Sequence, residues 1–236
     1  MSTVLITGAN RGLGLGFAGA YADMGWQVIA CCRKPSDELL ALAQRYSTLR
    51  IEALDVADHA AIDALAMRLK GEAIDVLLNN AGTYGRLGFA EGGIEHQAFG
   101  NTDYDNWEQV LRVNVFGPMK MAEAFVEHVE RSAQKKIVTL SSMMGSMGLN
   151  TSGGMYAYRT SKAAVNMMMH SMGIDLAKRG IIAVALHPGW ARTDMGGPGA
   201  EIDPTESVEG MMAVIEKLNA DHLGQLTAYD GSVLPY

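Results

Sequence analysis

The sequence predicts an α/β fold built on a doubly wound parallel sheet. Short apolar runs alternate along the chain with longer stretches of helical periodicity, and the glycine-rich and polar motifs fall where the apolar runs end. Strands that alternate with helices form parallel sheets with right-handed crossovers, and the helices cover both faces. The length of 236 residues suits one such α/β/α sandwich, so we expect a single domain over residues 1–236.

The expected strands are short apolar runs, as in sheets buried on both faces. They are Thr3–Ile6, Gln27–Cys31, Arg50–Leu54, Ile74–Leu78, Lys136–Leu140, Ile181–Leu186 and Leu226–Tyr229. The expected helices are longer amphipathic stretches. They are the segment after Gly12, Asp37–Tyr46, His59–Lys70, Asn106–Arg131, Ala157–Lys178 and Thr205–Leu218. Two glycine-rich stretches, Tyr84–Gly100 and Arg192–Ala200, predict loops on the side where ligands bind, outside the carboxyl ends of the strands.

Charge and composition favour small-molecule chemistry. The net charge of −7 disfavours sequence-independent binding to nucleic acid, which needs a basic face. Apolar runs stay well short of a membrane span, and Met1 leads into the first strand without the pattern of a secretion signal. The two cysteines, Cys31 and Cys32, are neighbours in an expected strand, so their side chains point to opposite faces. We expect free thiols and a cytoplasmic protein.

A glycine-rich turn follows the first strand in the segment Thr7–Gly14. Gly8 permits a tight turn, while Gly12 and Gly14 let the backbone approach a ligand closely. The N-terminus of the next helix would then face a pyrophosphate. The spacing Gly-x-x-x-Gly-x-Gly also occurs in ordinary glycine-rich turns. Asn79-Asn80-Ala81-Gly82, at the end of the fourth strand, favours the nucleotide interpretation because its small residues leave room for a ribose.

Tyr158 and Lys162 form a Tyr-x-x-x-Lys pair in an expected helix. Residues four apart lie on one helix face, so the ammonium can favour the ionised form of the phenol. Such a tyrosine can act as an acid or base. The same spacing also arises by chance on protein surfaces. The order of the two motifs and their separation in the sequence are therefore the stronger evidence for a catalytic pair.

Taken together, these motifs resemble the short-chain dehydrogenase/reductase family, and the resemblance spans nearly the whole chain. The motifs are Thr7-Gly8-x-x-x-Gly12-x-Gly14, Asn79-Asn80-Ala81-Gly82, Val113-Asn114-Val115-Phe116-Gly117, Ser141-Ser142, Tyr158-x-x-x-Lys162 and Pro188-Gly189. The segment from Pro188 to Met195 and the end of the chain are most similar to the branch of C-factor-like proteins and small carbonyl reductases. The resemblance implies a Rossmann-type fold. It also implies a homodimer or homotetramer formed through the helices Asn106–Arg131 and Ala157–Lys178.

The resemblance implies four catalytic residues. Tyr158 is the expected proton donor, and Lys162 lowers its pKa and holds the ribose of the nicotinamide. Ser142 binds the substrate oxygen, and Asn114 holds a water that connects Lys162 to solvent. Ser142 is preferred to Ser141 because it takes the second position of the serine pair. Three residues more than usual separate it from Tyr158, and we place them in the turn-forming run Asn150–Gly154.

The residues expected to hold the cofactor follow the same motifs. They are Gly8, Asn10, Arg11, Gly12, Leu13, Gly14, Arg33, Asp55, Val56, Asn80, Ala81, Gly82, Asn114, Tyr158, Lys162, Pro188, Gly189 and Thr193. The resemblance assigns Asp55 to the adenine amino group and Thr193 to the nicotinamide carboxamide. The alternative for Asp55 is an N-cap of the helix that starts near His59.

Charge predicts NADP(H) rather than NAD(H). A dinucleotide without a 2′-phosphate is usually held by an acidic residue after the second strand, and this chain has Cys32-Arg33-Lys34 there. The Arg33 guanidinium can pair with a phosphate, and Arg11 adds a second positive group. The alternative is that Arg33 and Lys34 simply begin a solvated loop.

The sequence therefore predicts an NADPH-dependent reductase that converts an aldehyde, ketone or quinone to an alcohol. The alternative is an NADP(H)-binding regulatory or signalling protein of the same fold. The six histidines and two cysteines show no metal-ligand spacing, so we expect no metal.

Overall fold

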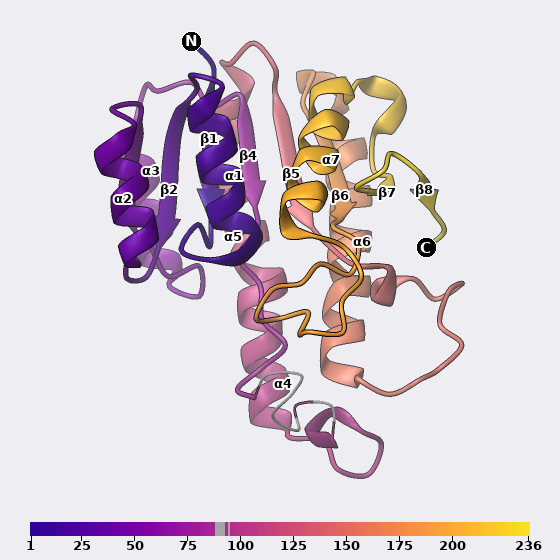
Figure 1. Cartoon of the computed structure of the whole chain (residues 1–236). Helices are drawn as coiled ribbons and strands as arrows, with labels where there is room; N and C mark the ends of the chain where they lie inside the picture. Colours follow the sequence, from indigo (N-terminus) through magenta and orange to yellow (C-terminus); the bar gives the residue numbers. More distant parts are fainter. Residues whose placement is uncertain (88–92, 94) are drawn as a thin grey trace.

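One sheet runs through the molecule with helices on both faces, in a computed structural model that describes residues 1–87, 93 and 95–236 (Figure 1). Within these residues, eight strands follow the order β3-β2-β1-β4-β5-β6-β7-β8. The strands are β1 Thr3–Thr7, β2 Gln27–Cys32, β3 Leu49–Ala53, β4 Val76–Asn79, β5 Lys136–Leu140, β6 Ile182–His187, β7 Leu226–Ala228 and β8 Val233–Leu234. The first seven pair in parallel, which confirms the doubly wound fold.

Helices α1 (Gly12–Asp23), α2 (Asp37–Arg45) and α7 (Pro204–Lys217) cover one face of the sheet. Helices α3 (His59–Arg68), α5 (Gly117–Glu130) and α6 (Tyr156–Leu176) cover the other. Strand residues alternate between the two cores: Val4 and Ile6 pack towards α1, and Leu5 packs towards α5. The order reverses between β1 and β4, so a crevice for a ligand opens outside their carboxyl ends.

The long helix expected over Asn106–Arg131 is not continuous. It consists of α4 (Tyr104–Leu111), a π-helical turn (Arg112–Phe116) and α5. Pro118 gives the physical reason, because it has no N–H to donate to the carbonyl of Asn114 four residues earlier. The widened turn therefore lies at the residue expected in the catalytic set, as π-turns at functional sites often do.

The last strand, β8, was not predicted, and it runs antiparallel to β7. The two strands are joined by a tight turn in which Ala228 N–H donates to the carbonyl of Ser232 at 2.8 Å. Gly231 takes a positive φ of 88° there. The pair Asp230-Gly231 is the sequence signal for such a hairpin, and a short turn can join only antiparallel strands.

The expected loop Tyr84–Gly100 lies partly outside the described residues. Its described end contains a short 3₁₀ turn, Glu95–Gln97. Among the described residues, no helix combines the length and apolar character that crossing a membrane requires.

Candidate active site

Two glycines of the turn at the end of β1, Gly8 and Gly14, have no space for a side chain. Gly8 has a φ of 67°, and a Cβ there would lie 2.8 Å from the Cα of Ala81. A Cβ on Gly14 would overlap the carbonyl oxygen of Gly8. These positions require glycine because the turn packs directly on the end of β4 and on the first turn of α1.

Asn80 fastens that turn to the sheet. Its Nδ2 donates to the carbonyls of Thr7 (2.9 Å) and Gly8 (3.1 Å), and its backbone N–H donates to Thr7 Oγ1 at 3.1 Å. The backbone N–H of Ala81 shares Thr7 Oγ1. One strand further, Asn79 Nδ2 donates to Thr139 Oγ1 at 3.3 Å and links β4 to β5. The asparagine pair thus fixes the β1–β4 crevice.

The N-terminus of α1 suits an anionic ligand. Arg11 occupies the N-cap position without making a side-chain cap hydrogen bond, and the first helical turn carries no acidic residue. The N–H groups of that turn and the positive end of the helix dipole therefore face the crevice. Together with the glycine cradle, this arrangement fits the pyrophosphate of a dinucleotide.

Two expected cofactor residues have partners within the protein. The side chain of Asn10 accepts a hydrogen bond from Ser36 N–H, and its carbonyl accepts one from Ser36 Oγ at 2.9 Å. Arg11 forms an exposed ion pair with Asp194 at 2.9 Å. Arg33 is exposed, directly after β2. Asn10 thus holds the segment after Arg33 in place, and Arg11 reaches across to the loop that follows β6.

The remaining expected cofactor residues line the same edge of the sheet. Asp55 Oδ1 accepts from Ala57 N–H at 2.9 Å, whereas Asp58 caps α3, so the N-cap alternative for Asp55 is wrong. β6 ends directly before Pro188, as expected. Thr193 Oγ1 accepts from Gly196 N–H at 3.2 Å, which folds the loop after β6 back on itself.

Leu13 and Val56 complete the expected set. Leu13 packs partly buried against the α1 side of the core, and Val56 is buried in the core of the α5 side. A Cβ on Gly117 would lie 2.8 Å from the carbonyl oxygen of Val56, so the start of α5 packs closely on that segment. Gly189, after Pro188, has a φ of 74°.

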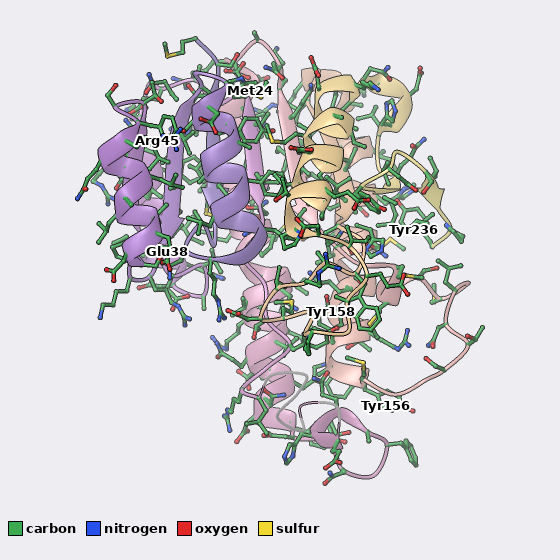
Figure 2. All side chains as sticks on the ribbon, viewed as in Figure 1. Met24, Glu38, Arg45, Tyr156, Tyr158 and Tyr236 are labelled. Atoms are coloured by element: carbon green, nitrogen blue, oxygen red, sulfur yellow. The ribbon has the colours of Figure 1, made fainter. Side chains whose placement is uncertain are left out.

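Tyr158 lies in the first turn of α6, where Figure 2 labels it, and Lys162 follows one turn later. Ser142 comes two residues after the end of β5. Tyr158 and Lys162 are each only 6% exposed. Lys162 Nζ lies 5.7 Å from the centre of the Tyr158 ring and donates to the carbonyl of Leu140 at 2.8 Å. Ser142 hydrogen-bonds the Tyr158 side chain, and its Oγ accepts from Met144 N–H at 3.1 Å.

Ser141 faces the interior instead. Its Oγ donates to Asn166 Oδ1 and lies 3.3 Å from the carbonyl of Lys162. The two serines therefore have different surroundings, because successive side chains in an extended segment point in opposite directions. Ser142 therefore lies beside the Tyr158 phenol, and Ser141 is hydrogen-bonded to α6.

Burial governs the ionisation of this site. It raises the pKa of Tyr158, Tyr84 adds to the rise, and the hydrogen bond from Ser142 opposes it. Burial also lowers the pKa of Lys162 to about 8. Burial thus favours the protonated form of the phenol. That Lys162 in turn favours the ionised form stays a prediction, and its Nζ lies 5.7 Å from the centre of the ring.

Asn114 uses all its amide groups. Its Oδ1 accepts from Thr83 N–H at 2.8 Å, and its Nδ2 donates to the Thr83 carbonyl (2.9 Å) and to Ser161 Oγ (3.0 Å). The residue thereby ties the π-turn to α6 and to the segment after β4. A Cβ on Gly82 would lie 3.6 Å from Asn114 Oδ1 and 3.8 Å from Lys162 Nζ, so Gly82 lies beside both groups.

Two residues of this site were not predicted from the sequence. Tyr84 stacks on Tyr158 with ring centres 4.0 Å apart and an angle of 20° between the rings. Gln97 is buried, donates to the carbonyl of Tyr84 at 2.8 Å and accepts from the N–H of Tyr158 at 2.8 Å. Tyr84 stands two residues after Gly82 in a loop expected on the ligand side, so its position in the sequence could have identified it as a site residue. Gln97 belongs to no motif.

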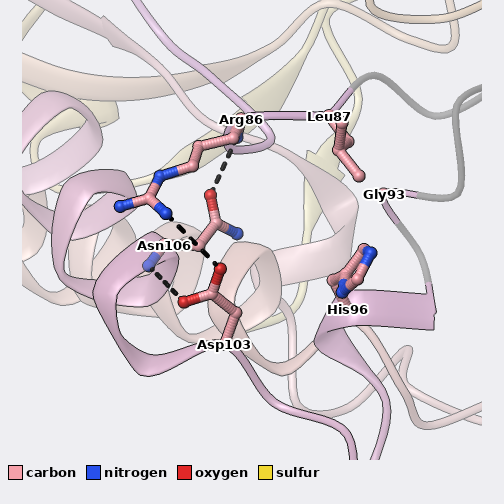
Figure 3. A pocket seen from close by; sticks show the side chains of 6 residues that line it. All are labelled: Arg86, Leu87, Gly93, His96, Asp103 and Asn106. Carbon is pink, nitrogen blue, oxygen red and sulfur yellow. Dashed lines mark hydrogen bonds and ion pairs between the residues drawn. The ribbon is translucent and has the colours of Figure 1, made fainter.

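A cavity of about 200 Å³ lies between the start of α4 and the segment after β4 (Figure 3). It is lined by Arg86, Leu87, Gly93, His96, Asp103 and Asn106. Asn106 Oδ1 accepts from Arg86 N–H at 2.8 Å, and Arg86 pairs with Asp103 at 3.8 Å. These contacts hold the segment after Tyr84 on α4.

Comparison with known proteins identifies the family. The family model described as short chain dehydrogenase matches residues 2–201. The chain belongs to the short-chain dehydrogenase family. This match confirms the resemblance drawn from the motifs.

Two curated family members are similar in sequence. The C-signal protein of Myxococcus xanthus is 40% identical over 163 residues, which are 69% of this chain and 93% of that protein. The 1-hydroxy-2-glutathionyl-2-methyl-3-butene dehydrogenase of Rhodococcus sp. (strain AD45) is 33% identical over 243 residues, with 100% of both chains covered.

Solved structures agree with the branch as well as the family. The carbonyl reductase Sniffer of D. melanogaster has a TM-score of 0.89 and 32% identity, with 100% of both chains covered. The NADPH-bound carbonyl reductase from chicken fatty liver has a TM-score of 0.89 and 33% identity, with 100% of this chain and 99% of that chain covered. A short-chain dehydrogenase/reductase from Burkholderia multivorans with bound NADP has a TM-score of 0.87 and 33% identity, with the same coverage.

Proposed function

We propose that the protein is an NADPH-dependent reductase that converts an aldehyde, ketone or quinone to an alcohol. The convergence of Ser142, Tyr158 and Lys162 beside the glycine cradle carries this proposal. The NADPH and NADP complexes of the similar carbonyl reductase and short-chain dehydrogenase/reductase support the cofactor and the direction of the chemistry.

The chain holds NADP(H) through its backbone and two arginines. Gly8 and Gly14 leave room for the pyrophosphate at the start of α1, where free N–H groups face it. Arg33 lies where a 2′-phosphate needs a positive group, and Arg11 can add a second when it leaves Asp194. Bound there, the cofactor supplies the hydride.

The side chains manage the proton and the negative charge. Tyr158 is protonated at neutral pH and donates to the oxygen of the substrate as that oxygen gains electrons. Ser142, which already hydrogen-bonds the phenol, gives the oxygen a second donor. Lys162 then stabilises the phenolate that remains, since its ammonium lies on the same helix face.

Asn114 positions the route by which Tyr158 regains its proton. Its side-chain amide is committed to Thr83 and Ser161, so a water that serves Lys162 binds at the Asn114 carbonyl. Pro118 offers that carbonyl no N–H four residues on, which favours water as a partner.

The test is oxidation of NADPH against NADH by the purified protein with a panel of aldehydes, ketones and quinones. We expect carbonyl-dependent oxidation of NADPH and at least about tenfold slower oxidation of NADH. Tight binding of NADPH with no turnover on any carbonyl would contradict a reductase. That result would favour an NADP(H)-binding signalling protein, a candidate that the similarity to the C-signal protein brings forward.

We also propose that the protein forms a homodimer or homotetramer through α4–α5 and α6. Exposed apolar side chains lie on these helices and on the π-turn between them: Phe116, Met119, Met167 and Ile174. Such side chains gain stability when a second copy covers them. Light scattering at micromolar concentration should give a multiple of 25.3 kDa, and a monomer mass would contradict the proposal.

We also propose a cytoplasmic location, which the thiols support. Cys31 and Cys32 are both free and buried. Burial raises the pKa of the Cys31 thiol, which keeps it unreactive. Separation of cell fractions with an antibody to the protein would test this location.

A further inference from the structure

We propose that Tyr84 is a specificity-determining residue whose hydroxyl occupies the position of the substrate oxygen until a carbonyl compound displaces it. Its ring then becomes a wall that favours aromatic or conjugated carbonyl compounds. This inference rests on the proposed reductase function and names the substrate class that the same site selects.

The first observation is the stack itself. The Tyr84 and Tyr158 rings lie 4.0 Å apart and within 20° of parallel, and Tyr158 is buried. The Tyr84 ring therefore covers one face of the Tyr158 ring, beside the hydroxyl that a carbonyl compound must reach. Planar π-systems stack favourably on such a ring, so an aromatic substrate replaces the lost ring contact and an aliphatic one does not.

The second observation is the direction of the hydrogen bonds. The Tyr84 hydroxyl donates its single proton to Met144 Sδ at 3.8 Å. In its hydrogen bond with Tyr158 the Tyr84 oxygen therefore accepts, and Tyr158 donates. A substrate oxygen must accept the same Tyr158 proton. The Tyr84 oxygen therefore competes with it directly.

The third observation is that the backbone around Tyr84 is fixed. Gln97, 1% exposed, joins the Tyr84 carbonyl to the Tyr158 N–H with two hydrogen bonds of 2.8 Å. Asn114 holds the preceding residue, Thr83, through two more. Displacement is thus a rotation of the Tyr84 side chain about a fixed backbone, and the ring stays beside the bound substrate.

The test compares Tyr84→Phe with the native protein, using butanal and benzaldehyde as substrates. The variant keeps the ring and loses the competing oxygen, so we expect KM for butanal to fall roughly three- to tenfold and KM for benzaldehyde to fall less. Tyr84→Leu removes the wall and should raise KM for benzaldehyde relative to butanal by a similar factor. The matched control is Tyr156→Phe, on the same helix as Tyr158, which should change neither value.

The pH profile separates competition from a merely structural role. The ionisable groups around the phenol are Tyr84 and Lys162, with Arg159 acting on Tyr84 and Lys162 acting in turn on His187. Tyr84→Phe should move the basic limb of kcat/KM to lower pH, because the free site loses the acceptor that keeps Tyr158 protonated. The limb of kcat should stay in place, since the bound substrate has already displaced Tyr84.

A binding measurement makes the result independent of turnover. The Kd values of butan-1-ol and benzyl alcohol for the NADPH-loaded protein need no reaction, and Tyr84→Phe should lower the first roughly three- to tenfold. Unchanged KM, Kd and pH limb in a folded Tyr84→Phe protein would overturn the inference. Failure of the native protein to oxidise NADPH would overturn the reductase proposal and leave these Kd values to decide the role of Tyr84.

Discussion

The cofactor cradle, formed by the Gly8–Gly14 turn and Asn79–Gly82, and the catalytic corner, formed by Ser142, Tyr158, Lys162 and Tyr84, lie at neighbouring strand ends and are held together differently. The cradle depends on space at Gly8 and Gly14, where a Cβ would collide with the backbone of Ala81 and of Gly8. The corner depends on side-chain hydrogen bonds among buried groups whose pKa values burial has shifted. The cradle should therefore respond to added volume and the corner to lost polar atoms.

Within the cradle, the largest effect on NADPH binding is expected from Gly14→Ala. The new methyl group overlaps the carbonyl of Gly8, so the turn must open and NADPH binding should weaken by about a hundredfold or more. Gly19→Ala is the matched control on the same helix, because its Cβ would meet Leu42 at an ordinary 3.7 Å. That variant should bind NADPH normally and gain stability. Fluorescence titration of NADPH measures both, and equal affinities would contradict the role of space.

The corner should distinguish its two serines. Ser142→Ala removes a donor to the reacting oxygen, so kcat should fall about a hundredfold while NADPH affinity is kept. Ser141→Ala leaves Asn166 Oδ1 without its donor, and we expect a loss of stability of about 1–3 kcal/mol with most turnover kept. Steady-state kinetics and thermal melting check the pair. The reverse pattern would assign the role to Ser141.

A smaller effect is expected from a change of charge near the cofactor cradle than from a change of side-chain volume within it. Arg33→Asp removes the positive group after β2 and adds a negative one, so the preference for NADPH over NADH should fall by at least about tenfold. Arg45→Asp makes the same change of charge on α2 and should leave the preference intact. An unchanged ratio of kcat/KM for the two cofactors in Arg33→Asp would show that Arg33 belongs to a solvated loop.

The smallest effect concerns His187, which lies at the end of β6 beneath the corner. Burial lowers its pKa to about 4, from 6.5 for an exposed histidine. The unfolded chain thus binds more protons between these values, so this contribution to stability is complete above pH 6.5 and is lost as the pH falls towards 4. At pH 5.5 the loss is about 1 kcal/mol. Urea unfolding at pH 7 and pH 5.5 should show a smaller difference for His187→Asn than for the native chain. An equal difference would contradict the assignment.

The comparison also explains which parts of the molecule could be predicted from the sequence. The cradle was predictable because close backbone approach demands glycine at fixed spacing, and Tyr158 with Lys162 because helix periodicity places them on one face. The buried pair of Tyr84 and Gln97 was not predictable. Gln97 meets Tyr158 across 61 residues of chain, and such a contact follows from the path of a long loop rather than from a local pattern. The π-turn had a readable cause in Pro118, and β8 had one in Asp230-Gly231.

The central claim is that the cradle binds the cofactor while the corner performs the proton transfer. The most direct measurement takes NADPH affinity and carbonyl-dependent turnover from the same preparation of Tyr158→Phe, with Tyr156→Phe as the control. We expect Tyr158→Phe to bind NADPH within about twofold of the native protein and to lose about a thousandfold in kcat, with the control unchanged in both. Turnover that survives in Tyr158→Phe, or NADPH affinity that falls in step with turnover, would contradict the account.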